Sequence, residues 1–373
     1  MPLSAQTQKI ALAPWVAWRM YHTSSESRCF ISNERLRTYL LLTGESAELF
    51  DTIARGCTPA ELLSYAVQLQ VDDELNVFIA SLEQELLLNT SADIEASTAD
   101  NTVLTSELLD IEQEMIKWAG NNGFLYSCHI DLTYRCNQAC LHCYNPEATL
   151  RRTGCFAADA ELTTAEIITL LDQLVKLGVF RIILSGGEAT LRPDLLVILH
   201  AARQRGFCVE LYSNGLGFTD SFVGCLQQWG IHKVSLSLYS HQPQQHDRVT
   251  GISGSWEQTV HSFKLLKQYG IETACKSIPM RDTIDGYFET KSFCATLANS
   301  VSMDMSLSAG YGNNLTPLEL QPTEEQMAEV FRQEISQGRL KKQSTLDLNQ
   351  PPCGAGRKSL CIGPDGNIYP CTG

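Results

Sequence analysis

Most of the chain after Tyr126 alternates between short apolar runs and amphipathic stretches. Six runs predict strands: YSCHIDLTY, VFRIILSGG, FCVELYSNG, HKVSLSLYS, IETACKSIP and VSMDMSLSA. Helical patterns lie between most of them, such as SWEQTVHSFKLLKQYG, which stops at Gly270. This alternation predicts an α/β fold with a parallel sheet and right-handed crossovers. Six such units suit an open, partial (β/α)6 barrel, and a doubly wound sheet is the alternative.

The first part of the chain follows a different pattern. WVAWRM and RCFISN are short, aromatic and β-prone, so they can pair as strands. LTGESAELFDTIARG and ELNVFIASLEQELLL have helical spacing, and between them TPAE is a capping box with Thr58 as N-cap. Two or three strands with three helices favour a small winged-helix-like α+β domain. The alternative is a plain cap packed on the main domain.

Composition shifts suggest the boundaries between these parts. Residues 89–106 are rich in Ser, Thr, Asp and Asn, which is typical of a linker. We therefore expect an N-terminal domain over residues 1–92 and a linker with a lead-in helix over 93–123. The barrel would occupy residues 124–320, and a C-terminal region of different character would occupy 321–373.

Net charge and cysteine content limit the possible binding partners and the cellular compartment. The 373 residues carry a net charge of −14, so nucleic acid and anionic membrane surfaces are poor partners. No stretch of eighteen apolar residues predicts a membrane span, and the N-terminus lacks a signal-peptide pattern. We therefore expect a cytoplasmic protein. Its 14 cysteines are then reduced core residues, reactive groups or metal ligands.

Three of these cysteines crowd into CNQACLHCY, directly after the first strand of the barrel. Cys136, Cys140 and Cys143 have the spacing C-x3-C-x2-C, at the mouth where parallel barrels bind ligands. Thiolates hold iron–sulfur clusters, and three of them leave one iron of a four-iron cluster open. A structural zinc site, with His142 as fourth ligand, is the alternative.

The cysteine motif, together with SGGEATLRPD, YSNG and VSLSLYS at the next three strand ends, resembles the radical S-adenosylmethionine (SAM) superfamily. The resemblance covers about residues 124–310. It implies that the three cysteines hold a [4Fe–4S] cluster whose open iron binds SAM. It also implies that SAM cleavage gives a 5'-deoxyadenosyl radical, which takes a hydrogen atom from a substrate.

The resemblance also implies a set of residues around SAM. They are His142, Gly186, Gly187, Glu188, Ser213, Asn214 and Ser237. In this set the glycines let the backbone approach the methionine end, and Glu188 accepts from the ammonium group. His142 stands where relatives usually have an aromatic residue near the adenine. Tyr239 is a departure, because many relatives carry Asp there.

The end of the chain, CGAGRKSLCIGPDGNIYPC, resembles the start of a SPASM or twitch extension. This implies at least one auxiliary iron–sulfur cluster, with Cys353, Cys371 and Cys361 as candidate ligands. PDGNIYP predicts a β-hairpin that brings Cys353 and Cys371 together at its base. The alternative for Cys361 is a core cysteine. We expect a truncated extension here, with the remaining ligands on a longer native chain.

The N-terminal domain resembles the PqqD-like element that recognises peptides in maturases of ribosomally made peptides. The stretch from LTGESAELF to LEQELLL carries the resemblance, which implies that a leader peptide adds as a strand to the sheet. We expect the strand with RCFISN to be the receiving edge.

Together these features predict a radical SAM maturase that modifies a ribosomally synthesised precursor peptide by a crosslink, thioether or epimerisation. The resemblance implies an external electron donor such as flavodoxin or ferredoxin. One alternative is a sulfatase-type maturase that oxidises Cys or Ser of a protein substrate. Another is a non-catalytic iron–sulfur scaffold or electron carrier.

Overall fold

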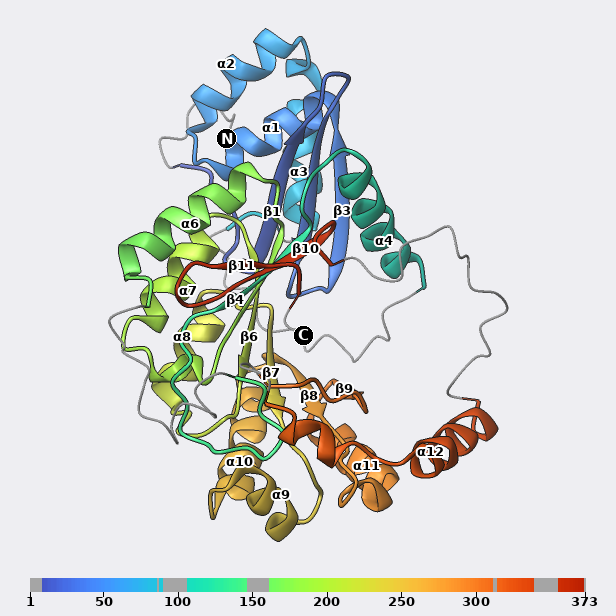
Figure 1. Cartoon of the computed structure of the whole chain (residues 1–373). Coiled ribbons are helices and arrows are strands. Elements are labelled where there is room, and N and C mark those ends of the chain that lie inside the picture. Colours follow the sequence, from blue (N-terminus) through green and yellow to red (C-terminus); the bar gives the residue numbers. More distant parts are fainter. Residues whose placement is uncertain are drawn as a thin grey trace.

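The structure is a computed structural model, and the chain folds into two β-sheets with their helices (Figure 1). It describes residues 9–85, 87–89, 106–145, 161–310, 314–338 and 355–371, with the backbone alone for 106–110. Within these residues, none of the helices has the length and apolar character needed to cross a membrane.

The larger sheet contains all six predicted barrel strands, which pair in parallel and in chain order. They are β4 (Ser127–Asp131), β5 (Arg181–Ser185), β6 (Cys208–Ser213), β7 (Lys233–Ser237), β8 (Glu272–Ser277) and β9 (Ser300–Met303). The order never reverses, so the sheet fits a partial barrel and not the doubly wound alternative. The predicted α/β fold with a parallel sheet is confirmed.

Helices cover one face of this sheet (Figure 1). They are α6 (Thr164–Lys176), α7 (Leu195–Gln204), α8 (Asp220–Gln228), α10 (Ser255–Gln268) and α11 (Tyr287–Leu297), whereas α9 (Pro243–Thr250) packs beside the cysteine loop. α6 begins at a capping box, in which Thr163 and Glu166 satisfy each other's backbone amides. Alternate strand residues such as Ile130, Ile182 and Val209 fill the core beneath the helices.

The opposite face of the same strands is polar, and we call it the inner face. Because side chains alternate along a strand, the residues between the core positions all point there. Its members include His129, Asp131, Glu210, Tyr212, Ser235, Lys276 and Cys361. The side chain of Ser235 donates to Glu210 over 2.6 Å, and Lys276 lies over the ring of Tyr212.

A C-terminal hairpin extends the sheet beyond β4. β10 (Ser359–Ile362) pairs in parallel with β4, with Cys361 opposite His129, and β11 (Ile368–Tyr369) pairs antiparallel with β10. The predicted hairpin is therefore confirmed, and its attachment to β4 was not expected. Before it, α12 (Glu324–Ser336) begins at a third capping box. Cys353 lies outside the described residues.

The N-terminal sheet has the order β1–β2–β3 and is antiparallel. Its elements are β1 (Val16–His22), β2 (Ser27–Asn33), β3 (Thr38–Thr43), α1 (Gly44–Ala54), α2 (Pro59–Leu69) and α3 (Leu75–Gln84). The predicted pairing of the first two strands and the capping box at Thr58 are both present. The expectation that RCFISN forms an edge is wrong, because this strand is β2 and pairs on both sides.

The N-terminal domain packs on the barrel at the ends where the parallel strands begin. The backbone amide of Trp18 in β1 donates to Gly206, and Arg203 donates to the carbonyls of Pro14 and Val16. A lead-in helix, α4 (Ser106–Asn121), packs on the other side against β3 (Figure 1). The cysteine loop lies at the opposite strand ends and stays clear of this interface.

Candidate functional site

Cys136, Cys140 and Cys143 are half-buried cysteines on the loop that follows β4. The end of α9 holds the middle of this loop. The backbone amide of Ala139 donates to the carbonyl of Thr250 over 2.8 Å, and Leu141 donates to Val249 over 3.0 Å. Sequence reasoning missed this support, because nothing in the local pattern tells which helix end will meet a loop.

Cys140 packs at the centre of this arrangement, against Tyr239, Val249 and Met280. Burial raises the pKa of its thiol, and the neighbouring Cys143 and Cys136 raise it further. The Tyr239 hydroxyl donates to the Cys140 sulfur and opposes this shift. The charges of the three thiolates would repel one another, and a bound cation would offset this repulsion, so the loop suits an iron–sulfur cluster.

His142 and Tyr239 form an aromatic wall beside the cysteines. Their ring centroids lie 4.6 Å apart in an edge-to-face arrangement, and His246 stacks on the other face of Tyr239. Burial lowers the pKa of His142 to about 4, so its ring is neutral at neutral pH. Within the described part of the chain its Nδ1 has no hydrogen-bond partner, which leaves a buried polar atom available to a ligand.

Gly186 and Gly187 stand where the loop after β5 touches the start of the cysteine loop. A Cβ on Gly187 would lie 2.5 Å from the carbonyl oxygen of Tyr134 and closer still to that of Arg135. A Cβ on Gly186 would overlap the carbonyl oxygen of Thr133, and its φ of 133° also favours glycine. The close backbone contacts therefore require glycine at both positions, whether or not a cofactor binds.

Glu188 is a buried carboxylate that links the ends of β5 and β6. It accepts from the hydroxyl of Ser213 over 2.9 Å, from the amide of Asn214 over 2.8 Å, and from the amide and hydroxyl of Thr190. Burial raises its pKa, and these hydrogen bonds oppose that effect. The network orients the carboxylate toward the strand ends, next to the cysteine loop.

Asn214 completes the connection between β6 and the cysteine loop, because its side-chain amide donates to Asn137 over 2.7 Å. The predicted residues after β5 and β6 are thus joined in one hydrogen-bonded group with this loop. Ser237 ends β7, and its side chain hydrogen-bonds with Tyr239. It is thereby connected to the aromatic wall.

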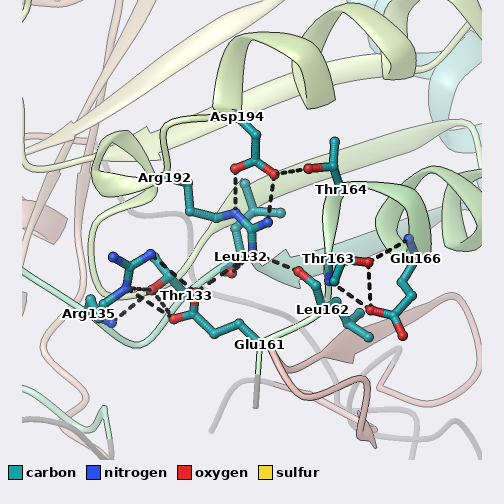
Figure 2. Close-up of polar contacts among 10 residues, drawn as sticks. All are labelled: Leu132, Thr133, Arg135, Glu161, Leu162, Thr163, Thr164, Glu166, Arg192 and Asp194. Carbon is teal, nitrogen blue, oxygen red and sulfur yellow. Dashed lines mark hydrogen bonds and ion pairs between the residues drawn. The ribbon is translucent and has the colours of Figure 1, made fainter. Parts of the chain in front are cut away.

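A second hydrogen-bonded network holds the residues that lead into the cysteine loop (Figure 2). Arg192 is buried, binds Asp194 through two nitrogens at 2.9 and 2.7 Å, and donates to the carbonyls of Leu132 and Leu162. Glu161 accepts from Thr133 and Arg135, the residues that lead into Cys136. Sequence reasoning missed Arg192. Arg192 lies two residues before Asp194, the N-cap of α7. A positive charge near a helix N-terminus is unfavourable unless an acidic group offsets it, and this was the signal in the sequence.

The described candidate auxiliary ligands lie on the C-terminal hairpin. Cys361 is buried on β10 and faces His129 and Asp131, while Cys371 is exposed after β11. Burial raises the pKa of Cys361 to about 12, with Asp131 and Cys371 as further causes. Cys361 is therefore not a plain apolar core cysteine, since its neighbours are polar.

Comparisons with known proteins agree with this geometry. The Radical SAM superfamily model matches residues 130–283. A PqqA peptide cyclase of Rhizobium meliloti (strain 1021) is 27% identical over 254 residues, which cover 65% of this chain and 66% of that protein. A PqqA peptide cyclase of Gluconobacter oxydans (strain 621H) is 26% identical over 252 residues, covering 65% and 68%. The match to the first relative thus spans slightly less than two thirds of its length.

Two solved structures of SuiB from Streptococcus suis share the fold. The first covers 97% of this chain and 83% of SuiB, with a TM-score of 0.54 and 15% identity. The second, SuiB bound to the precursor peptide SuiA, covers the same shares with a TM-score of 0.55 and 14% identity. This likeness covers most of the chain and shows a shared fold.

Proposed function

Residues 130–283 belong to the radical SAM superfamily, and from this premise we propose that the protein is a maturase of a ribosomally synthesised precursor peptide. The observation that carries the proposal is the group of three thiols after β4, with the loop of Gly186, Gly187 and Glu188 packed against it. The names of the relatives, PqqA peptide cyclase, support a peptide as the substrate.

In this proposal Cys136, Cys140 and Cys143 bind three irons of a [4Fe–4S] cluster. When bound, the cluster and SAM supply a 5'-deoxyadenosyl radical that takes a hydrogen atom from the substrate. The chain's own residues position SAM. Glu188 accepts from its ammonium group, and His142 offers a neutral ring and a free Nδ1 to the adenine.

The remaining members of the predicted set act around the same ligand. The backbone at Gly186 and Gly187 would hold the methionine end, while Ser213, Asn214 and Ser237 would contact SAM from the ends of β6 and β7. The inner face then receives the peptide side chain, because it is polar and lies beneath the cysteine loop. Polar groups there would orient the substrate and, where a crosslink or thioether forms, would take up the proton that leaves while the auxiliary cluster accepts the electron.

We propose that the N-terminal domain binds the leader of the precursor through β3. In the sheet order β3 is one of two edges, and the other edge, β1, already meets the barrel at Gly206. A strand added to β3 would gain main-chain hydrogen bonds without disturbing that interface. The solved complex of SuiB with the precursor peptide SuiA supports a peptide partner for this architecture.

An auxiliary cluster and an electron donor belong to the same proposal. Cys353 and Cys371 are the candidate cluster ligands in this proposal. A flavodoxin or ferredoxin would deliver the electron, in the cytoplasm, where thiols stay reduced.

The proposal is tested by anaerobic reconstitution with iron and sulfide, followed by addition of SAM and dithionite. We expect 5'-deoxyadenosine, and we expect Cys136→Ala to abolish it. With a candidate precursor peptide, we expect either the loss of two hydrogens, as a crosslink or thioether requires, or a retained mass with an inverted centre. If no 5'-deoxyadenosine forms in the wild-type chain, the enzymatic proposal is wrong.

A further inference from the structure

His129, Asp131 and Cys361 form a compact group on the inner face, apart from the cysteine loop. One ligand atom from each lies within 4.8 Å of the others. Nε2 of His129 lies 3.0 Å from Oδ1 of Asp131, and the register of β4 with β10 places Cys361 directly opposite His129. Three potential ligands are therefore held on two paired strands, which is a rigid support.

The chemistry of the group suits a transition-metal ion. Imidazole, carboxylate and thiolate together are ligands of zinc and of neighbouring divalent metals, and three protein ligands leave a position open. The electrostatic neighbours of Cys361 are Asp131 and Cys371, both of which favour a cation. The His129 ring also contacts Tyr212 edge-on at 5.9 Å, which limits its motion.

A second group of the same residue types provides a contrast. Glu34, Cys208 and His232 also lie close together, at the interface of the two domains. There the strongest electrostatic neighbours of Cys208 are the cations Arg181 and Arg203. Two guanidinium groups oppose the binding of a further cation, so composition alone does not make a metal site. The group on the inner face lacks such opposing neighbours among those that act on Cys361.

We propose that His129, Asp131 and Cys361 bind one divalent transition-metal ion of the zinc class on the inner face. The site is distinct from the three-cysteine loop and does not depend on SAM chemistry. It connects β4 to the C-terminal hairpin. Its open position is available to water or to an oxygen or sulfur donor of the peptide.

The test uses the full chain with Cys136, Cys140 and Cys143 all replaced by Ala, so that the cysteine loop cannot bind metal. Co2+ is added anaerobically as the probe, and the near-ultraviolet thiolate-to-cobalt absorption is titrated. We expect one equivalent to bind. Cys361→Ser should abolish the absorption, and His129→Ala or Asp131→Asn should weaken binding by about 10-fold or more.

Cys128→Ala is the matched control, because Cys128 neighbours His129 on β4 but points to the opposite, apolar face. It should leave cobalt binding unchanged. A thermal melt with and without Co2+ guards against misfolding, because a ligand that binds only the folded state raises the melting temperature. We expect that rise in the parent and in Cys128→Ala, a smaller rise in Asp131→Asn, and no rise in Cys361→Ser.

Absence of cobalt absorption in the parent, or its survival in Cys361→Ser, would overturn the proposal. Neither result touches the proposed function, since 5'-deoxyadenosine formation is measured on the wild-type chain with its cysteine loop intact. If the chain binds cobalt here but forms no 5'-deoxyadenosine, the proposal of the metal site stands and the proposal of a peptide maturase is rejected.

Discussion

The side-chain amide of Asn214 donates to the side-chain oxygen of Asn137 over 2.7 Å, which joins the end of β6 to the cysteine loop. Asn214 also binds Glu188 through its backbone amide, so three strand ends share one network. The cysteine loop is therefore positioned by the barrel before any cofactor arrives.

The first prediction concerns this bond. We expect Asn137→Ala to lower the free energy of unfolding of the metal-free chain by about 1 kcal/mol, the usual net value of one hydrogen bond. Urea unfolding measures this. Gln227→Ala is the control, because Gln227 makes an exposed hydrogen bond to Tyr269 far from the loop and should change stability less. Equal losses in both variants would contradict the prediction.

The second prediction compares two glycines. Gly187→Ala should lower the free energy of unfolding by about 3 kcal/mol or more, because the added Cβ would collide with the backbone carbonyls of Tyr134 and Arg135. Gly224→Ala, inside α8, meets only a side-chain atom at 3.7 Å and should stabilise by about 0.5–1 kcal/mol. Both are read from urea unfolding. If Gly187→Ala left the free energy of unfolding unchanged, the loops after β4 and β5 would not be in the close contact described.

The third prediction is a pH dependence. Hydrogen bonds from Arg192, then from Thr164, lower the pKa of Asp194 to about 2 (Figure 2). An unfolded Asp titrates near 3.9, so this ion pair stabilises fully above that pH and is lost as pH falls toward 2. At pH 3 the loss should be about 1 kcal/mol relative to pH 6.

Asp194→Asn tests this, since it removes the titrating group. The variant should be less stable at pH 6 but should lose less stability than the wild type between pH 6 and pH 3, measured by urea unfolding of the metal-free chain. Asp172→Asn is the control, because Asp172 is an exposed partner of Arg205. Identical pH slopes in the wild type and Asp194→Asn would reject the assignment.

The fourth prediction concerns Tyr239, where many relatives of the proposed family carry Asp. Its hydroxyl donates to the Cys140 sulfur, and such bonds stabilise the more negative, reduced cluster. We expect Tyr239→Phe to make the reduction potential more negative by about 40 mV, the equivalent of about 1 kcal/mol for one electron. A redox titration followed by electron paramagnetic resonance measures it. Tyr212→Phe on the inner face should leave the potential unchanged.

The fifth prediction locates the leader peptide. Backbone amides of β3 should exchange more slowly with deuterium when the precursor peptide is bound, because strand addition pairs them. Amides of β1 should not change, since that edge already faces Gly206 of the barrel. Protection confined to the barrel would place the peptide there and contradict leader binding by this domain.

Much of the barrel could be predicted from sequence, because each strand keeps an apolar row for the helices and ends in a polar or glycine turn. β3 was missed because TYLLLT runs without a break into the helix that follows it, so no alternation marks it. The position of β2 was wrong for a different reason. Local patterns report that a strand exists but carry no information on which neighbours it pairs with.

The candidate functional site also contains residues that the sequence identifies and residues that it does not. Cys136, Cys140 and Cys143 could be named as candidate ligands from the sequence, because their spacing places all three on one short loop. Arg192 and the carbonyl of Thr250 could not, because they act on backbone atoms of distant segments. Contacts of that kind depend on tertiary packing, which hydrophobic periodicity does not encode.

The pairing of β10 with β4 has a consequence for biosynthesis. β4 leads into the cysteine loop, yet its outer neighbour is among the last described residues to leave the ribosome. Until then β4 presents an open strand edge, which invites pairing with other chains. Contacts of such high sequence separation also slow folding. We infer that cluster insertion before release of the hairpin would act on an incomplete sheet, so the timing of iron delivery relative to translation becomes a determinant of yield.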